Sequence, residues 1–141
     1  MTDYATADAL SDLLPMVTVN EATEPTTAQV EGYITLRSAE LDAVLGGRGY
    51  SLPVTDSDAL AYLKTVCLYG VAAMVLRAKF PTSENVEAAY AALYRDALAD
   101  IRDGRVLIPD AALETDTIGE GFTVDADGEA TAPLITRKTE W

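Results

Sequence analysis

Apolar residues recur at helical spacing along most of the chain, and the clearest stretch lies between two sets of boundary signals. It begins at Thr26 or Thr27, whose hydroxyl can accept a free backbone N–H, and it ends at Gly46-Gly47. Within it the apolar positions are separated by four or seven residues, which places them on one face of a helix. These positions are Val30, Ile34, Leu41 and Leu45.

Two more long helices are predicted after this one, and they differ in pattern. The first runs from Asp56 or Ser57 to about Phe80, where Pro81 ends it, and it is apolar on all faces. A helix of this kind is central or covered by neighbours. Because a chain of this size has few helices to cover it, we expect another subunit to cover part of its surface. The second begins at Ser83, ends at Gly104 and has an apolar stripe of Val86, Tyr90, Leu93, Ala97 and Ile101.

A short helix at the beginning and a polar segment at the end complete the predicted organisation. Asp3 or Thr6 can cap the short helix, which Pro15 ends. The predicted fold class is therefore all-α, a small bundle of one short and three longer helices over residues 1–109. Residues 110–141 contain too few apolar residues for a core, so we expect an extended C-terminal arm. Alternating residues before Asp127-Gly128 favour a small β-hairpin around residues 122–132.

The charge of the chain excludes several functions. Among 141 residues there are 23 acidic and 10 basic ones, a net charge of -13. We therefore expect repulsion from DNA rather than sequence-specific binding. No basic and apolar leader is present at the N-terminus, so export is not expected. The most apolar run, Thr65 to Leu76, has 12 residues and is predicted to be a core segment rather than a membrane span.

Catalytic chemistry has little support in the sequence. The chain contains no histidine, and its single Cys67 lies in an apolar run, so we expect a buried thiol rather than a nucleophile. Glu84 and Glu87, with Asp100 and Asp103, have the paired spacing of helical Mg²⁺-dependent nucleotide pyrophosphohydrolases. On one helix, however, the two pairs would be roughly 20 Å apart. We expect no metal and no cofactor.

Large apolar groups beside positive charge mark the last part of the arm. Leu134, Ile135 and Trp141 surround Arg137 and Lys138, the only bases after Arg105. An apolar anchor supplies affinity and a local charge fixes the register of a docking peptide. The predicted partner-docking residues are Phe122, Leu134, Ile135, Arg137, Lys138 and Trp141, and the predicted subunit-contact residues are Leu68, Tyr69, Val75 and Tyr94.

Taken in order, several segments resemble the small head–tail connector, or adaptor, proteins of tailed bacteriophages, including prophage and gene-transfer-agent relatives. The resemblance covers about residues 4–109, and the order of its motifs carries it. The similar segments are Tyr4-Ala5-Thr6-Ala7-Asp8-Ala9-Leu10, Ala39-Glu40-Leu41-Asp42-Ala43-Val44-Leu45, Arg48-Gly49-Tyr50-Ser51-Leu52-Pro53, Leu60-Ala61-Tyr62-Leu63-Lys64 and Tyr94-Arg95-Asp96-Ala97-Leu98-Ala99-Asp100-Ile101-Arg102-Asp103-Gly104. The ending Thr136-Arg137-Lys138-Thr139-Glu140-Trp141 is similar to the basic-aromatic endings of some such proteins.

The resemblance implies a non-enzymatic virion protein. Such subunits, usually twelve, form a ring beneath the portal protein, extend the channel through which genomic DNA passes, and offer a surface to a stopper or tail-completion protein. The implied location is the head–tail interface, and the host cytoplasm during assembly, without membrane contact. Two alternatives remain open, a metal-dependent nucleotide pyrophosphohydrolase using Glu84 and Glu87 and a soluble regulatory protein that binds one host protein.

Overall fold

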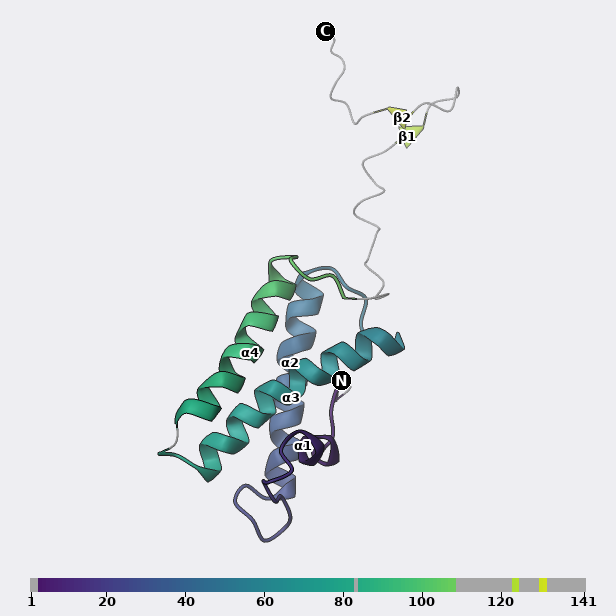
Figure 1. The fold of residues 1–141 in the computed structure, drawn as a ribbon. Helices are drawn as coiled ribbons and strands as arrows, with labels where there is room; N and C mark the ends of the chain where they lie inside the picture. Colours follow the sequence, from purple (N-terminus) through teal and green to yellow (C-terminus); the bar gives the residue numbers. More distant parts are fainter. Residues whose placement is uncertain (1–2, 83, 109–122, 125–129, 132–141) are drawn as a thin grey trace.

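In the computed structural model, the described part of the chain contains four helices that form one bundle (Figure 1). The structure describes residues 3–82 and 84–108, together with 123–124 and 130–131. The helices are α1 (Ala7–Leu13), α2 (Thr27–Gly47), α3 (Ser57–Lys79) and α4 (Glu84–Arg102). The predicted all-α bundle of one short and three longer helices is confirmed.

The first two helices begin at threonine caps, as the sequence predicts. The Thr6 hydroxyl accepts the N–H of Ala9 at 3.2 Å, and α1 ends before Pro15. Thr26 caps α2 in the same way, and the Gln29 side chain accepts the N–H of Thr26 at 2.9 Å, so both parts of a capping box are present. All four residues of the predicted apolar stripe of α2 are buried, namely Val30, Ile34, Leu41 and Leu45.

The third helix is the centre of the bundle. The Asp56 carboxylate caps it by accepting the N–H groups of Asp58 and Ala59, and Phe80 follows its last turn. The other three helices all pack against α3. Its buried residues lie on several faces and include Leu63, Val66, Cys67, Leu68, Val71, Ala72, Val75 and Leu76. The chain's own helices therefore cover much of the apolar surface of α3, and coverage of the remainder by another subunit stays a prediction.

By length and composition, α3 could cross a membrane. The helix has 23 residues and is therefore longer than the apolar run from Thr65 to Leu76 within it. The mean hydropathy of its most apolar window is 1.8. However, 61% of that window is buried in the bundle. Such burial is typical of the core helix of a bundle. In the described part of the chain, α3 is the only helix long and apolar enough to cross a membrane.

A glycine allows α3 and α4 to approach closely. Gly70 of α3 lies against the ring of Tyr94, and a Cβ atom placed on Gly70 would be only 2.8 Å from Cδ2 of that ring. Tyr94 also contacts two residues of α2. Its hydroxyl donates to Glu40 Oε2 at 2.8 Å, and the Arg37 guanidinium lies 4.7 Å from the ring centroid. One aromatic side chain thus joins the three long helices.

The buried face of α4 differs from its predicted stripe. Tyr94 and Ile101 are buried, and Tyr90, Ala97 and Leu98 pack against the core. Val86 and Leu93, both predicted to face the core, are about half exposed. They are rotated by roughly 80–100° around the helix from Tyr94, because successive helical residues are about 100° apart. The prediction was therefore wrong for these two positions.

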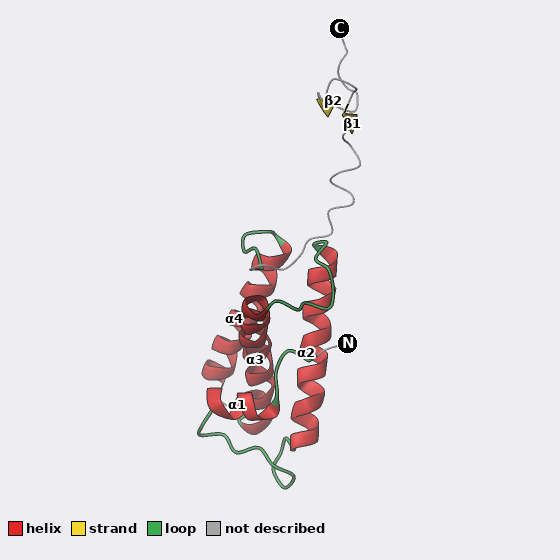
Figure 2. Ribbon diagram, turned by 90° about the vertical axis from the view of Figure 1, so that its right-hand side faces the viewer, coloured by secondary structure: helices red, strands yellow, loops and turns green. Residues whose placement is uncertain are grey.

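The segment before α1 is tied to α2 by Tyr4. Its backbone N–H donates to the buried Ser38 hydroxyl at 3.0 Å, and its own hydroxyl donates to Asp42. The α1 helix lies across the lower end of the bundle in Figure 2. These contacts hold the N-terminal segment against α2, where Ser38 also touches Cys67 of α3, with 3.7 Å between Oγ and Sγ.

After α4 the chain remains attached to the bundle as far as Ile108. The side chain of Ile108 is buried, and its N–H donates to the hydroxyl of Tyr50 at 3.2 Å. Beyond it, β1 (Thr123–Val124) and β2 (Ala130–Thr131) pair as antiparallel strands, with Thr123 opposite Thr131. The pairing confirms the predicted small β-hairpin. The rest of the predicted arm, including its turn at Asp127-Gly128, lies outside the described residues.

Candidate functional site

An apolar groove opens at one end of the bundle. Its volume is about 350 Å³, and α1, the segment after α1, the end of α3 and the start of α4 form it. Three of its large apolar side chains are strongly exposed, Met16 at 89%, Val86 at 53% and Phe80 at 50%. The lining residues are Leu13, Leu14, Pro15, Met16, Val17, Leu76, Phe80, Val86, Glu87 and Tyr90.

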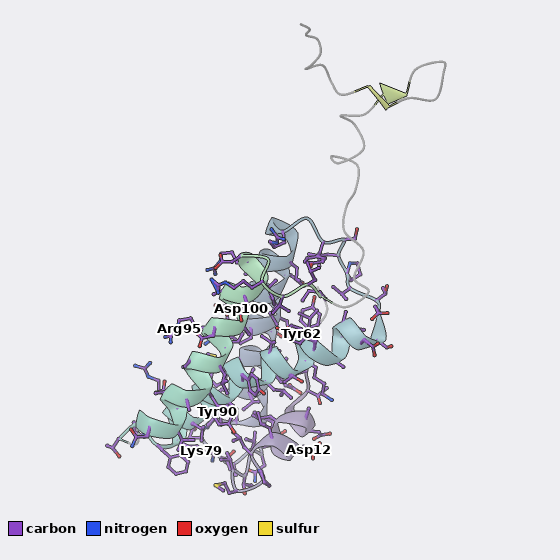
Figure 3. All side chains as sticks on the ribbon, turned by 45° about the horizontal axis from the view of Figure 1, so that its top comes forward. Asp12, Tyr62, Lys79, Tyr90, Arg95 and Asp100 are labelled. Atoms are coloured by element: carbon purple, nitrogen blue, oxygen red, sulfur yellow. The ribbon has the colours of Figure 1, made fainter. Side chains whose placement is uncertain are left out.

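Helix ends explain why apolar side chains gather at this place. Pro15 follows α1 and Pro81 follows α3 after one capping residue, and proline disfavours helical backbone in the residue before it. Met16 and Phe80 therefore lie next to helix ends, and both side chains remain exposed there. Figure 3 shows Tyr90, Lys79 and Asp12 at this end of the molecule and Asp100 toward the other end of α4.

The charge at the groove is small and mixed. Glu87 is the one charged residue that lines it, and Arg77 Nη1 lies 4.0 Å from Glu87 Oε1. Arg77 is 80% exposed, so this ion pair contributes little. Binding at this groove would therefore depend on apolar contact area.

A second hollow lies between the N-terminal segment and α2, but its chemistry is different. It has a volume of about 480 Å³, and its lining includes Asp3, Thr6, Glu31 and Thr35. The Thr35 hydroxyl donates to Asp3 at 3.3 Å, at the solvent-exposed rim. This hollow has a mixed polar and apolar lining, and within the described residues none of its lining side chains has a buried polar atom without a partner, so the apolar groove is the better candidate for a functional site.

Polar groups between α2 and α4 form a structural cluster. Arg37 Nη1 lies 2.6 Å from Glu40 Oε2, the same oxygen that accepts the Tyr94 hydroxyl. The Nε atom of Arg37 is buried without a hydrogen-bond partner. Burial raises the pKa of Tyr94, and the hydrogen bond to Glu40 raises it further. Tyr94 is therefore a neutral donor at physiological pH, and the cluster positions helices rather than exchanging protons.

Cys67 is buried, as the sequence predicts. Burial raises the pKa of its thiol, and the contact with Ser38 lowers the pKa by a smaller amount. A thiol with a raised pKa contains little of the thiolate that acts as a nucleophile. Cys67 is thus a core residue in this structure.

The carboxylates considered for metal binding lie along α4. Glu87 and Asp100 are both on this helix, and Asp103 follows its end. Asp100 and Asp103 each pair with Arg105, at 2.9 and 2.6 Å. The side chain of Glu84 lies outside the described residues. Within the described residues, no three histidine, cysteine or carboxylate side chains lie close enough to hold a metal ion.

The predicted subunit-contact residues are used mainly within the chain. Val75 is fully buried, Leu68 and Tyr94 are more than nine-tenths buried, and all three belong to the hydrophobic core. In this conformation these three side chains contribute to the chain's own core, and their role as subunit contacts stays a prediction. Tyr69 is half-buried and contacts Tyr90, with 6.1 Å between ring centroids.

The predicted docking residues of the arm lie outside the described part of the chain. They are Phe122, Leu134, Ile135, Arg137, Lys138 and Trp141. The residues that form the apolar groove were not predicted as a site. Their signal in the sequence was an apolar residue next to a proline at a helix end, as in Pro15-Met16 and Phe80-Pro81.

Comparison with known proteins gives no relative of this chain. No family model matches it, and no curated protein or solved structure matches it significantly.

Proposed function

We propose that this chain is a structural virion protein, an adaptor subunit that joins a phage capsid to its tail. Copies of the chain would form a ring beneath the portal protein and extend the DNA channel. In the head–tail connector proteins that the sequence resembles, the ring usually has twelve subunits. A stopper or tail-completion protein binds the other side of the ring. The protein acts at the head–tail interface of the virion and assembles there from the host cytoplasm.

The apolar groove is the observation that carries the proposal. An exposed cluster of large apolar side chains in a strongly acidic chain is typical of a protein interaction site. Met16, Phe80 and Val86 would be covered only when another polypeptide segment lies on them. Such a surface fits a subunit of an assembly better than a protein that acts alone.

The charge of the helical body is compatible with a position around DNA. Residues 3–108 contain fifteen acidic and eight basic side chains. Like charge on a channel wall disfavours phosphate contacts, so a passing duplex would not adhere to it. The excess of acidic side chains therefore supports passage of genomic DNA without specific binding.

Electron microscopy of particles that carry a labelled copy of the full chain tests the proposal. We expect label at the head–tail junction, and we expect Met16→Glu to remove the chain from particles while Leu36→Glu does not. Leu36 is a matched control, because it is 49% exposed and lies on α2 outside the groove. A chain that stays monomeric beside portal assemblies, or whose melting temperature rises with Mg²⁺ and nucleotides, would contradict the adaptor role.

A further inference from the structure

We propose that the segment of residues 133–141 docks into the apolar groove of its own chain and covers it before assembly. This inference goes beyond the adaptor role and does not depend on it, because it rests on the groove and on the sequence of the arm. The docked segment would act as an internal competitor that a partner protein must displace.

Charge selects this segment from the rest of the arm. Residues 109–132 contain seven acidic side chains and no basic one, whereas residues 133–141 contain two bases and one acid. The helical body has an excess of seven acidic residues over basic ones between positions 3 and 108. The body therefore repels the first part of the arm and attracts its last part.

Apolar content selects the same segment. Leu134, Ile135 and Trp141 supply aliphatic and aromatic side chains within nine residues. The groove presents Met16, Phe80 and other apolar side chains, and its volume of about 350 Å³ is small enough for a few side chains rather than a folded partner. An indole that enters such a groove buries a large apolar area, which is the main source of affinity in peptide docking.

The chain is long enough to reach its own groove. Ile108 lies past the end of α4, whereas Val86 lines the groove near the start of that helix. The 15 residue-to-residue steps from Val86 to Ile101 span about 22 Å of helix. Residues 109–122 alone can extend over roughly 46–50 Å. A tether that exceeds the span gives an effective concentration in the millimolar range, well above the concentration of other copies in dilute solution.

Trp141 gives a direct readout, since it is the only tryptophan of the chain. In the full chain at low concentration, we expect indole emission at shorter wavelength and weaker acrylamide quenching than in the denatured chain. Both signals should be independent of protein concentration. Val86→Glu and Met16→Glu should return them to the values of a solvated indole, because losing one well-buried apolar contact weakens docking about tenfold or more. Leu36→Glu, which lies outside the groove, should leave them unchanged.

Three outcomes would overturn the proposal. The first is an indole that is as accessible in the native chain as in the denatured one. The second is burial that disappears on dilution, which would assign the contact to a second copy. The third is burial that both groove substitutions leave intact while circular dichroism reports folded variants. Because the fluorescence is measured on the isolated chain and the adaptor role on particles, either idea can fail alone.

Discussion

Replacing Gly70 with alanine should destabilise the protein, although alanine is the better helix former. In the middle of a helix, alanine is favoured over glycine by about 1 kcal/mol. At Gly70, however, the new Cβ would lie 2.8, 2.9 and 3.0 Å from three atoms of the Tyr94 ring. Carbon atoms in contact prefer about 3.5–4.0 Å, so the ring or the helix must move.

The ring of Tyr94 is poorly able to move, and this sets the size of the effect. Overpacking of a core costs about 1–3 kcal/mol. A shift of the ring would also weaken its hydrogen bond to the Glu40 carboxylate, of a kind that contributes roughly 1.5–3 kcal/mol when well shielded. Overpacking less the helix propensity leaves about 0–2 kcal/mol, and the weakened hydrogen bond adds to this, so we expect Gly70→Ala to lower the free energy of unfolding by about 1–3 kcal/mol.

Gly32→Ala is the matched control, because Gly32 lies within α2 and has no atom within 4 Å of the position of a Cβ. There the same substitution should raise the free energy of unfolding by about 0.5–1 kcal/mol. Denaturant titrations of both variants measure the difference. In a double-mutant cycle, Tyr94→Leu should remove most of the cost of Gly70→Ala. If Gly70→Ala stabilises the protein as much as Gly32→Ala does, the close approach of α3 and α4 is not as described.

Two further predictions concern buried polar groups. Burial raises the pKa of Cys67 above its ordinary value of 9.0 and the pKa of Tyr94 above its ordinary value of 10.0. Because the unfolded chain then loses these protons at lower pH than the native protein does, their contribution to stability is complete below the ordinary pKa values and is lost as the pH rises above them. The free energy of unfolding should begin to fall above pH 9.0 through Cys67 and fall further above pH 10.0 through Tyr94, where the decline should be less steep in Tyr94→Phe; an unchanged slope would contradict the assignment. Ser38→Ala leaves the buried N–H of Tyr4 without its acceptor and should cost about 1–3 kcal/mol by urea titration, whereas the exposed Ser11→Ala should change stability by less than about 0.5 kcal/mol. Equal effects of the two serine substitutions would show that the Tyr4 contact is not stabilising.

Helix boundaries could be predicted from the sequence because their causes are local. Thr6, Thr26 and Asp56 each accept backbone N–H groups two or three residues ahead, and Pro15 and Pro81 follow helix ends. A contact between residues within one helical turn can be predicted from the sequence, because the two partners are close in it. For the same reason, the repeated spacing in α2 predicted its buried face correctly.

The position of α4 and the groove could not be predicted, because they depend on contacts between distant segments. Apolar residues of α4 occupy more than one face, and packing against α3 and α2, including the contacts of Tyr94 with Gly70 and Arg37, determines which face is buried. In this orientation of the helix Val86 is exposed. The groove then arises where α4 begins beside Met16, a residue seventy positions earlier in the chain.

The attachment of Ile108 determines how the bundle would bear a mechanical load. Tension applied to the chain beyond residue 108 enters the bundle at this residue, where the Tyr50 hydroxyl holds the backbone N–H and the core encloses the side chain. The force would thus reach the loop between α2 and α3 through the Tyr50 contact, and the end of α4 through the backbone. The Phe80 end of α3, where the groove lies, is the other end of that helix, so pulling on the arm would strain one end of the molecule before it disturbs the other.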